Sequence, residues 1–423
     1  MSDVRAYRAA ILHMLEEDEA EFFPDGLLVV EDGLIVSVGS YRDPGDIPLT
    51  HLPGRLITPG FVDTHIHFPQ VDVIASHGAQ LLDWLNTYTF PAERAFADSA
   101  HAAEAAEFFL GELLRNGTTS ALVFGSVHPA SVDALFEAAL ARNMRLIAGK
   151  SMMDRLAPDW LRDDVESCRA DLEVLIAKWG ARGRLGYAIT PRFALSCSEA
   201  ELTMAGELLA KHDHVWLQTH LSENHAEIEA TAEAFPAAKD YLDVYDSFGL
   251  VGPRSVFAHG VHLTTKNFTR LAEAGSAIAF CPTSNLFLGS GLFDMAGAEA
   301  SGVKLGLGTD VGGGTSYSLF CTAAEAYKVC QMHGHTLAPL KAFYLATLGG
   351  ARALGLADKI GNLTPGSEGD FLVLDLAATP LLGRRLAAAR TLEERLFALM
   401  ILADDRAVEA TYVAGVPVHR RDT

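Results

Sequence analysis

The sequence has few cysteines, no cluster of basic residues and no long apolar run. Its five cysteines (168, 197, 281, 321 and 330) are scattered and form no C-x-x-C pair, which favours reduced thiols over a disulfide framework. A formal charge of −21, with no basic run longer than Arg420-Arg421, argues against partners such as nucleic acids or anionic membranes. No apolar stretch approaches the roughly 18 residues of a membrane span, and a secretory signal is absent. We therefore expect a soluble, cytoplasmic protein.

Two missing motifs narrow the fold and the chemistry. No G-x-G-x-x-G opens a helix after the first strand-like run, which argues against a doubly wound open sheet. The H-x-E and P-C-x-x-C signature of cytidine-deaminase zinc sites is also absent. The length of 423 residues leaves room for an α/β barrel of about 250 residues and a second domain.

The middle of the chain alternates strand-like apolar runs with Ala- and Leu-rich helical patterns, as βα units do. The helical patterns include 100–115, 131–141, 198–211 and 265–274. The eight apolar runs are 56–67, 119–124, 145–150, 185–190, 215–220, 255–259, 277–281 and 303–310. Eight parallel strands with eight helices predict a (β/α)8 barrel of the TIM type.

Both ends of the chain have a β-rich texture. Near the N-terminus, 27–30 and 34–38 flank Asp32-Gly33, which is a hairpin signal. Near the C-terminus, strands are expected at 371–374 and at 410–413, the latter turning into 416–418. We predict a small β-sandwich domain from residues 1–58 and 366–423, and a barrel domain over residues 59–365.

Two histidines at i, i+2 follow the first apolar run. In a β-strand, His65 and His67 point to the same face and form half of a metal site. The spacing recurs at His212/His214 and His333/His335. The second pair precedes its apolar run and the third has no strand pattern around it, so only the first pair ends a predicted strand.

Further polar residues end other predicted strands, where a barrel places its active site. His220 ends the fifth run, His259 the sixth and Asp310 the eighth. Together with His65 and His67, these residues predict a nitrogen-rich metal site with one carboxylate, suited to zinc or ferrous iron.

Glu223 lies three residues after His220, just beyond the strand end. It can reach an open metal position and move a proton from water to a leaving nitrogen. Glu227 and Glu229 follow and are expected to be solvated helix positions. Lys150 ends the third run and offers a rival, since a carbamylated lysine bridges two metals in related barrels.

The motifs resemble the metal-dependent amidohydrolase superfamily, including its triazine aminohydrolases, and most closely the guanine deaminase family. The resemblance covers nearly the whole chain. Its most specific segments are 63–70, 84–93, 190–198, 220–224, 282–286 and 308–314.

The resemblance implies a zinc-dependent hydrolysis of guanine to xanthine and ammonia, as in purine catabolism. One Zn²⁺ would be held by His65, His67, His220 and Asp310. His259 would hydrogen-bond the attacking water and Glu223 would shuttle its proton, so Glu223, His259 and Asp310 would serve catalysis. A homodimer is also implied.

The same resemblance suggests which residues read the purine. Gln70 and Arg192 would bind the purine edge with Phe193 beside them, because a guanidinium donates to the carbonyl of guanine but not to the amino group of adenine. Trp84 and the segment to Glu93 could form a lid or a dimer contact.

Alternatives stay open at this point. Phe68 stands where a small residue is common in the family and could tighten the pocket, so another aminopurine, a pterin or an s-triazine is an alternative substrate. A non-catalytic scaffold is disfavoured by the intact ligand set and Glu223.

Overall fold

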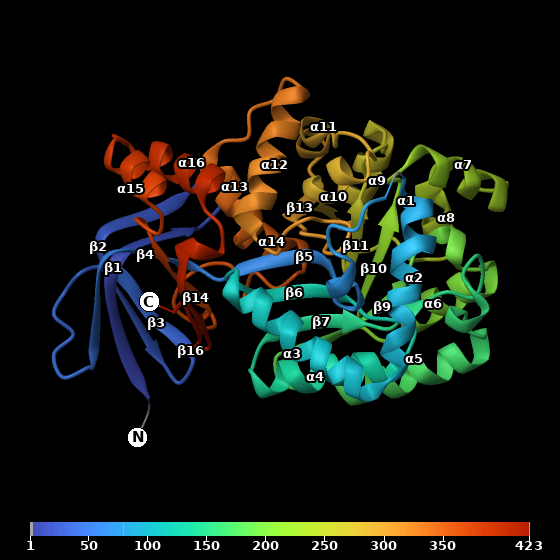
Figure 1. Ribbon diagram of the computed structural model, residues 1–423, viewed down its shortest axis with the longest axis horizontal. Coiled ribbons are helices and arrows are strands. Elements are labelled where there is room, and N and C mark those ends of the chain that lie inside the picture. Colours follow the sequence, from blue (N-terminus) through green and yellow to red (C-terminus); the bar gives the residue numbers. More distant parts are fainter. Residues whose placement is uncertain (1–2, 79, 423) are drawn as a thin grey trace.

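The computed structural model describes residues 3–78 and 80–422, and its strands form two sheets that lie side by side (Figure 1). The strands are β1 (Val4–Met14), β2 (Ala20–Glu31), β3 (Leu34–Ser40), β4 (Leu49–Pro59), β5 (Phe61–His67), β6 (Thr118–Phe124), β7 (Arg145–Gly149), β8 (Ser151–Met152), β9 (Leu185–Pro191), β10 (Trp216–Leu221), β11 (Ser255–His259), β12 (Ala277–Phe280), β13 (Lys304–Leu307), β14 (Phe371–Asp375), β15 (Val408–Val413) and β16 (Val416–Arg420).

Helices connect and surround these strands. The α-helices are α1 (Leu81–Trp84), α2 (Phe90–Arg94), α3 (Ser99–Arg115), α4 (Pro129–Ala141), α5 (Val165–Trp179), α6 (Glu199–Lys211), α7 (His225–Ala234), α8 (Tyr241–Ser247), α9 (Thr265–Ala274), α10 (Pro282–Phe287), α11 (Met295–Ala300), α12 (Leu319–Met332), α13 (Pro339–Ala346), α14 (Leu348–Ala353), α15 (Pro380–Ala387) and α16 (Leu392–Leu402). Short 3₁₀ turns occur at η1 (Phe68–Val73), η3 (Ala95–Ala97), η4 (Asp159–Leu161), η5 (Ala194–Ser196) and η6 (Asp405–Ala407), and η2 (Leu85–Thr89) is a π-helical turn.

The larger sheet is the barrel. Its strands run in the order β5, β6, β7, β9, β10, β11, β12 and β13, joined by parallel ladders. The first and last strands meet beyond their ends, where Asp310 N donates to the carbonyl of His65 at 2.9 Å and His67 N to that of Val311 at 2.8 Å. The predicted (β/α)8 barrel is confirmed, and each of the eight apolar runs overlaps one of its strands. Strands buried on both faces read as continuous apolar runs, which made them visible in the sequence.

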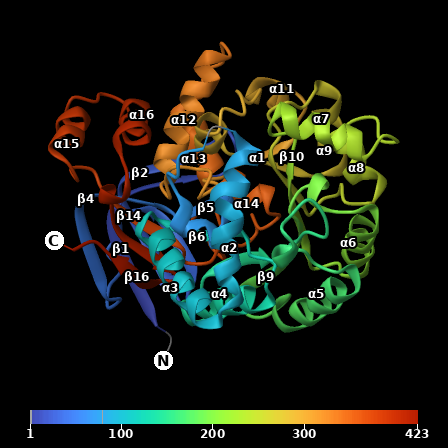
Figure 2. The same cartoon turned by 45° about the vertical axis from the view of Figure 1, so that its right-hand side comes forward.

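The predicted helices are also confirmed, and they lie around the barrel (Figure 2). The first long one, α3, begins after Asp98, whose carboxylate accepts the N–H of Ala100 at 2.8 Å as an N-cap. Its inward stripe includes Ala102, Phe109 and Leu113, which are fully buried. The cap and the stripe at helical spacing explain why this segment is a helix packed on the barrel.

The smaller sheet joins both ends of the chain in the order β16-β15-β14-β4-β1-β2-β3. The predicted hairpin between β2 and β3 forms, with Asp32 and Gly33 at φ of 49° and 85°, as its turn type requires. A core of aromatic rings closes one face, where Tyr7 meets Phe371 at 5.0 Å and Phe371 stacks on Tyr412 at 4.2 Å. The small domain from both termini is thus present, and its predicted boundaries stay predictions.

The segment 366–423 contains two helices that the sequence analysis did not anticipate, α15 and α16. The second begins after Thr391, whose hydroxyl accepts the N–H of Glu394 at 3.1 Å. It buries Leu396 and Leu399 against the barrel helices. No helix in the described ranges is long and apolar enough to cross a membrane.

Candidate metal and purine site

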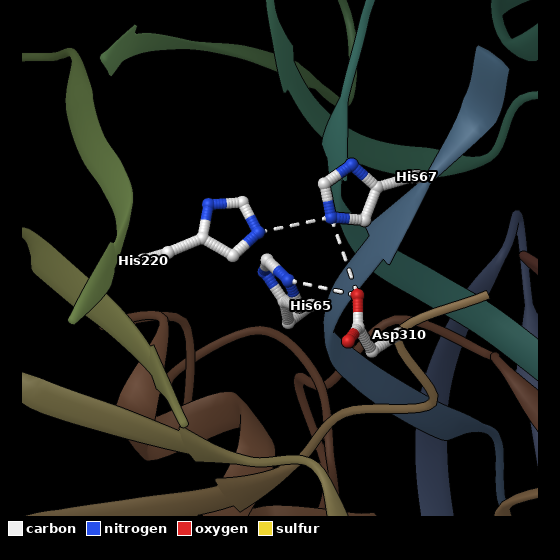
Figure 3. A group of neighbouring side chains, drawn as sticks. All are labelled: His65, His67, His220 and Asp310. Atoms are coloured by element: carbon white, nitrogen blue, oxygen red, sulfur yellow. Dashed lines mark hydrogen bonds and ion pairs between the residues drawn. The ribbon is translucent and has the colours of Figure 1, made fainter. Parts of the chain in front are cut away.

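The candidate site begins on β5, where the pleat turns His65 and His67 to one face. Both side chains are buried. The third histidine, His220, lies near the end of β10, and Asp310 follows β13. All four donor atoms lie within 4.8 Å of one another (Figure 3). The four predicted ligands are therefore brought together by three strands of the barrel.

The distances within this group suit a shared cation. Nε2 of His67 lies 3.1 Å from Nε2 of His220, and Oδ1 of Asp310 lies 3.2 Å from Nε2 of both His65 and His67. Tetrahedral zinc with bonds of about 2.0–2.1 Å would place neighbouring donor atoms about 3.3 Å apart. Within residues 3–78 and 80–422, Nε2 of His65 has no hydrogen-bond partner although it is buried. These residues fit a divalent metal.

The protonation states also suit metal binding. Burial lowers the pKa of His67 to about 3, and burial together with the charges of His65 and His67 lowers that of His220 well below its usual value. Nδ1 of His220 donates to the carbonyl of Arg192 at 2.5 Å, which leaves Nε2 as the acceptor. Burial acts to raise the pKa of Asp310, but its contacts with His65 and His67 hold it well below the ordinary value. The group thus offers neutral imidazoles at His67 and His220 and one carboxylate at Asp310.

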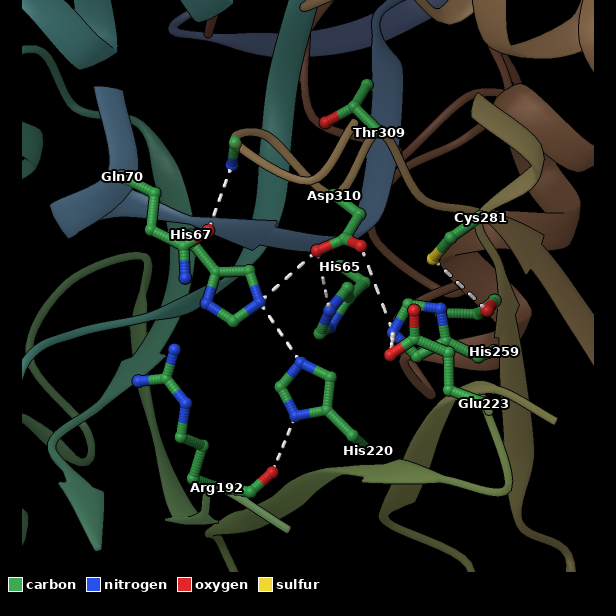
Figure 4. Close-up of polar contacts among 12 residues, drawn as sticks. His65, His67, Gln70, Arg192, His220, Glu223, His259, Cys281, Thr309 and Asp310 are labelled. Carbon is green, nitrogen blue, oxygen red and sulfur yellow. Dashed lines mark hydrogen bonds and ion pairs between the residues drawn. The ribbon is translucent and has the colours of Figure 1, made fainter. Parts of the chain in front are cut away.

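Glu223 and His259 face each other beside this group (Figure 4). Oε2 of Glu223 lies 3.5 Å from Nε2 of His259, which lies 3.8 Å from Oδ2 of Asp310. Nδ1 of His259 bonds Oδ1 of Asn285 at 2.8 Å, so Nε2 is left as the acceptor. Burial, and then the charge of Asp310, raise the pKa of Glu223 to about 8, while a hydrogen bond from Ser290 at 2.9 Å opposes the shift. A carboxyl group poised near neutral pH can accept and return a proton.

The predicted purine readers lie on the other side of the ligands. Arg192 follows β9 and its Nη1 contacts both oxygens of the buried Glu93 at 2.8 Å. Gln70 lies on η1, accepts the N–H of Gly312 at 3.1 Å and donates to Glu93 at 3.4 Å. A Cβ at position 312 would stand 2.7 Å from the Gln70 carbonyl oxygen, so this close approach requires glycine. Both amide and guanidinium are therefore held in fixed orientations, and Arg192 also forms a buried ion pair with Glu93.

One cavity connects the two halves of the site. Its walls include every predicted catalytic and purine-reading residue, with additional apolar and acidic residues: His67, Gln70, Leu81, Trp84, Leu85, Arg192, Phe193, His220, Glu223, Glu227, His259, Leu288, Asp310 and Gly313. Trp84 and Phe193 are buried in this wall. Trp84 therefore faces the cavity.

Three sequence interpretations differ from the structure. Phe68 does not tighten the pocket, because it packs on Phe96 and Phe109 at ring distances of 5.0 and 5.6 Å. Lys150 is not a metal bridge, because its Nζ lies 2.7 Å from both oxygens of Asp163 outside the ligand group. A strand-end residue can point inward or outward, and sequence alone does not say which.

Glu227 is the third difference. It is 1% exposed, whereas Glu229 is exposed as predicted. Its carboxylate turns back toward Glu223 instead of toward water.

The other two H-x-H pairs lie outside the site, as expected: His214 precedes β10, and His335 pairs with Glu299 at 3.3 Å.

Several supporting residues were not assigned roles from the sequence. Asp63 accepts the N–H groups of His65 and Thr309, both at 3.1 Å, and burial raises its pKa to about 6. Glu93 bonds Arg192 and Gln70, which are predicted to bind the purine. Asn285 bonds His259 and Ser290 bonds Glu223. Their partners lie far away in the chain, so only the spacing of Asp63 from His65 carried a local signal.

The comparisons with known proteins agree with this geometry. The model of the amidohydrolase family matches residues 56–418. A guanine deaminase of Escherichia coli (strain K12) is 50% identical over 406 residues, covering 95% of this chain and 92% of that protein. Among solved structures, E. coli guanine deaminase superposes with a TM-score of 0.96 at 47% identity, covering 99% and 100% of the two chains. A guanine deaminase from C. acetobutylicum with guanine bound in its active site has a TM-score of 0.91 at 30% identity, covering 98% and 100%. The chain therefore belongs to the amidohydrolase family and, within it, to the guanine deaminases.

Proposed function

We propose that this protein hydrolyses guanine to xanthine and ammonia with the help of one zinc ion. The observation that carries the proposal is a single cavity with a metal-ligand set and Glu223 at one end and Arg192 and Gln70 at the other. His65, His67, His220 and Asp310 would hold the metal. When bound, a divalent metal supplies a Lewis acid that lowers the pKa of water toward neutrality.

The chain's own groups then move the proton. Glu223 accepts a proton from the attacking water and delivers it to a ring nitrogen of guanine, while oxygen adds to the carbon that bears the amino group. His259 orients the water, and its ring is fixed by Asn285. The remaining hydroxyl proton passes to the amino group, so that cleavage of the C–N bond releases ammonia and the added oxygen becomes the second carbonyl of xanthine. Removal of a positioned acid–base group usually lowers the rate 10²- to 10⁴-fold.

Specificity follows from the hydrogen-bond donors on the Arg192 and Gln70 side of the cavity. The hydrogen bonds of the Arg192 guanidinium within the described chain all use Nη1, so Nη2 keeps its donors for a carbonyl oxygen. Gln70 adds an amide N–H on the same side. Adenine would present an amino group to these donors and leave them unpaired, at a cost of about 1–3 kcal/mol for each.

The experiment is turnover of guanine by the purified protein, followed by ammonia release and xanthine formation. We expect one metal per chain, and we expect Glu223→Ala to keep that metal and lose at least about 100-fold in kcat. A near-normal rate would remove Glu223 from the mechanism. Turnover of another aminopurine, a pterin or an s-triazine, with none of guanine, would favour the alternative substrate class.

A homodimer, a cytoplasmic location and a place in purine catabolism belong to the same proposal. They rest on the resemblance and on composition, and each has a direct measurement: solution mass, fractionation of cells, and guanine consumption by cells.

A further inference from the structure

The Glu223 carboxylate is carried by a strained turn. Directly before it, Ser222 has φ of 49°, the left-handed conformation that a non-glycine residue rarely adopts. Such a conformation is energetically unfavourable and persists only where the surroundings hold it. The turn therefore needs a clamp.

Glu227 supplies three contacts at this point. Its Oε2 accepts the N–H of Glu223 at 3.0 Å and the N–H of Asn224 at 3.2 Å, and its Oε1 accepts the hydroxyl of Tyr241 at 2.5 Å. Tyr241 is the first residue of α8 and is buried. These three hydrogen bonds of Glu227, called the clamp below, connect the turn after β10 to two helices, α7 and α8.

We propose that Glu227 is a positioning residue, which with Tyr241 holds the Glu223 turn so that the Glu223 carboxylate faces His259 and the cavity. An ordinary capping box, in which the glutamate reaches only the N-cap residue Asn224, would not engage Glu223. Here the additional bond reaches the backbone of Glu223 itself. Glu227 also lines the cavity, but its oxygens are occupied by these three donors, whereas Glu223 faces Nε2 of His259.

This inference rests on the proposed function, and kinetics with guanine test it. We expect Glu227→Ala to lower kcat at least tenfold, with KM changed less than threefold and metal content unchanged. Glu227→Gln keeps an acceptor for the two N–H groups and should recover most of kcat. The control is Glu229→Ala, an exposed position two residues later in the same helix, which should match the wild type.

A double variant separates positioning from a general loss of structure. If Glu227 acts through Glu223, Glu227→Ala adds no further loss of kcat in a Glu223→Ala background, because coupled residues are not additive. An equal loss in both backgrounds, or wild-type kcat in Glu227→Ala, would overturn the proposal. If Glu227→Ala does not fold, Tyr241→Phe replaces it and should lower kcat severalfold; an unchanged kcat there would count against the clamp.

A readout without substrate distinguishes failure of this inference from failure of the proposed function. Hydrogen exchange of the backbone amides of Glu223 and Asn224 should accelerate at least tenfold in Glu227→Ala and stay near wild type in Glu229→Ala. Unchanged exchange refutes the clamp. Faster exchange in a protein that does not turn over guanine supports the clamp and refutes the activity.

Discussion

At the scale of single residues, context separates chemically identical histidine pairs. Nε2 of His65 and Nε2 of His67 each lie 3.2 Å from Oδ1 of Asp310. By contrast, His333 bonds the carbonyl of Leu292 at 3.1 Å on the outside of the barrel. The same H-x-H spacing therefore predicts a metal ligand pair only where a buried strand ends.

Replacing each pair gives a matched test. We expect His65→Ala/His67→Ala to reduce bound metal from one per chain to nearly none, since two of four ligands are lost. His333→Ala/His335→Ala should retain it. Elemental analysis after dialysis, with thermal unfolding to check the fold, measures both. Loss of metal from the second variant would contradict the site.

Another residue-scale feature is Glu201 on α6, which is fully buried with neither oxygen hydrogen-bonded in the described ranges. Burial, and then the charge of Asp154, raise its pKa to about 8 from 4.5. The folded state therefore binds a proton that the unfolded state releases between these two values. This stabilisation is fully present below pH 4.5 and is lost as pH rises toward 8.

We therefore expect Glu201→Gln to gain stability relative to wild type as pH rises. Between pH 6 and pH 8 the relative gain should be on the order of 1–3 kcal/mol. The measurement is the difference in thermal midpoint between variant and wild type at each pH, which cancels other titrating groups. Glu199→Gln, at an exposed position of the same helix, should show no such trend. A constant difference for Glu201→Gln would refute the explanation.

At the scale of elements, the site is assembled from strand ends and from one inserted segment. The segment of α1, η2 and α2 brings Trp84 into the cavity wall and Glu93 under Arg192. The ring of Phe90 in the same segment lies 5.4 Å from Arg192 Cζ. The orientation of Arg192 thus depends on a helix about 100 residues before it.

We expect Arg192→Lys to lower kcat/KM for guanine about tenfold to a hundredfold, mainly through KM. Lysine keeps a positive charge for Glu93 but lacks the planar fork that reaches a second acceptor. Bound metal should be unchanged. Arg169→Lys, where an exposed arginine pairs with Glu207, is the control. Equal kcat/KM in both variants would contradict the role of Arg192.

Helices and strands were predictable from the sequence where their burial leaves a local pattern of apolar residues. The barrel strands appear as apolar runs, and their ends carried His220, His259 and Asp310. The direction of side chains was not predictable, since Lys150 and Phe68 turn away from the cavity toward partners distant in sequence. Glu227 was misjudged because a first-turn glutamate is usually solvated, and its burial depends on Tyr241 from the next helix.

At the scale of the whole molecule, the two sheets are joined by a group of charged side chains that are buried or half-buried. Glu368, before β14, pairs with Arg145 at the start of β7 and with Arg184 before β9. Arg184 also contacts Asp370 at 2.5 Å. These residues lie at the N-terminal ends of barrel strands, where a TIM-type barrel is built for stability rather than catalysis.

Removing Glu368 should therefore affect stability without affecting the site. Glu368→Ala leaves two part-buried arginines without this partner, although Arg184 keeps Asp370, so the cost should be on the order of 1–3 kcal/mol. We expect the thermal midpoint to fall on the order of 5 °C, with bound metal and kcat on guanine unchanged at 25 °C. Glu207→Ala breaks the exposed pair with Arg169 and should change the midpoint by about 1 °C or less. Equal changes in the thermal midpoint for Glu368→Ala and Glu207→Ala would show that the charged group around Glu368 does not stabilise the contact between the two sheets.

Asp63 connects the first and last strands of the barrel. Its Oδ1 accepts the N–H of His65 and, across 246 positions of the chain, the N–H of Thr309, both at 3.1 Å. Two predicted metal ligands, His65 and Asp310, thus lie on the first strand of the barrel and directly after its last strand. A growing polypeptide on the ribosome possesses three ligands long before the fourth is made. Metal capture and barrel closure should then be one late event in biosynthesis, and shortened chains that stop before Asp310 should emerge without the ion.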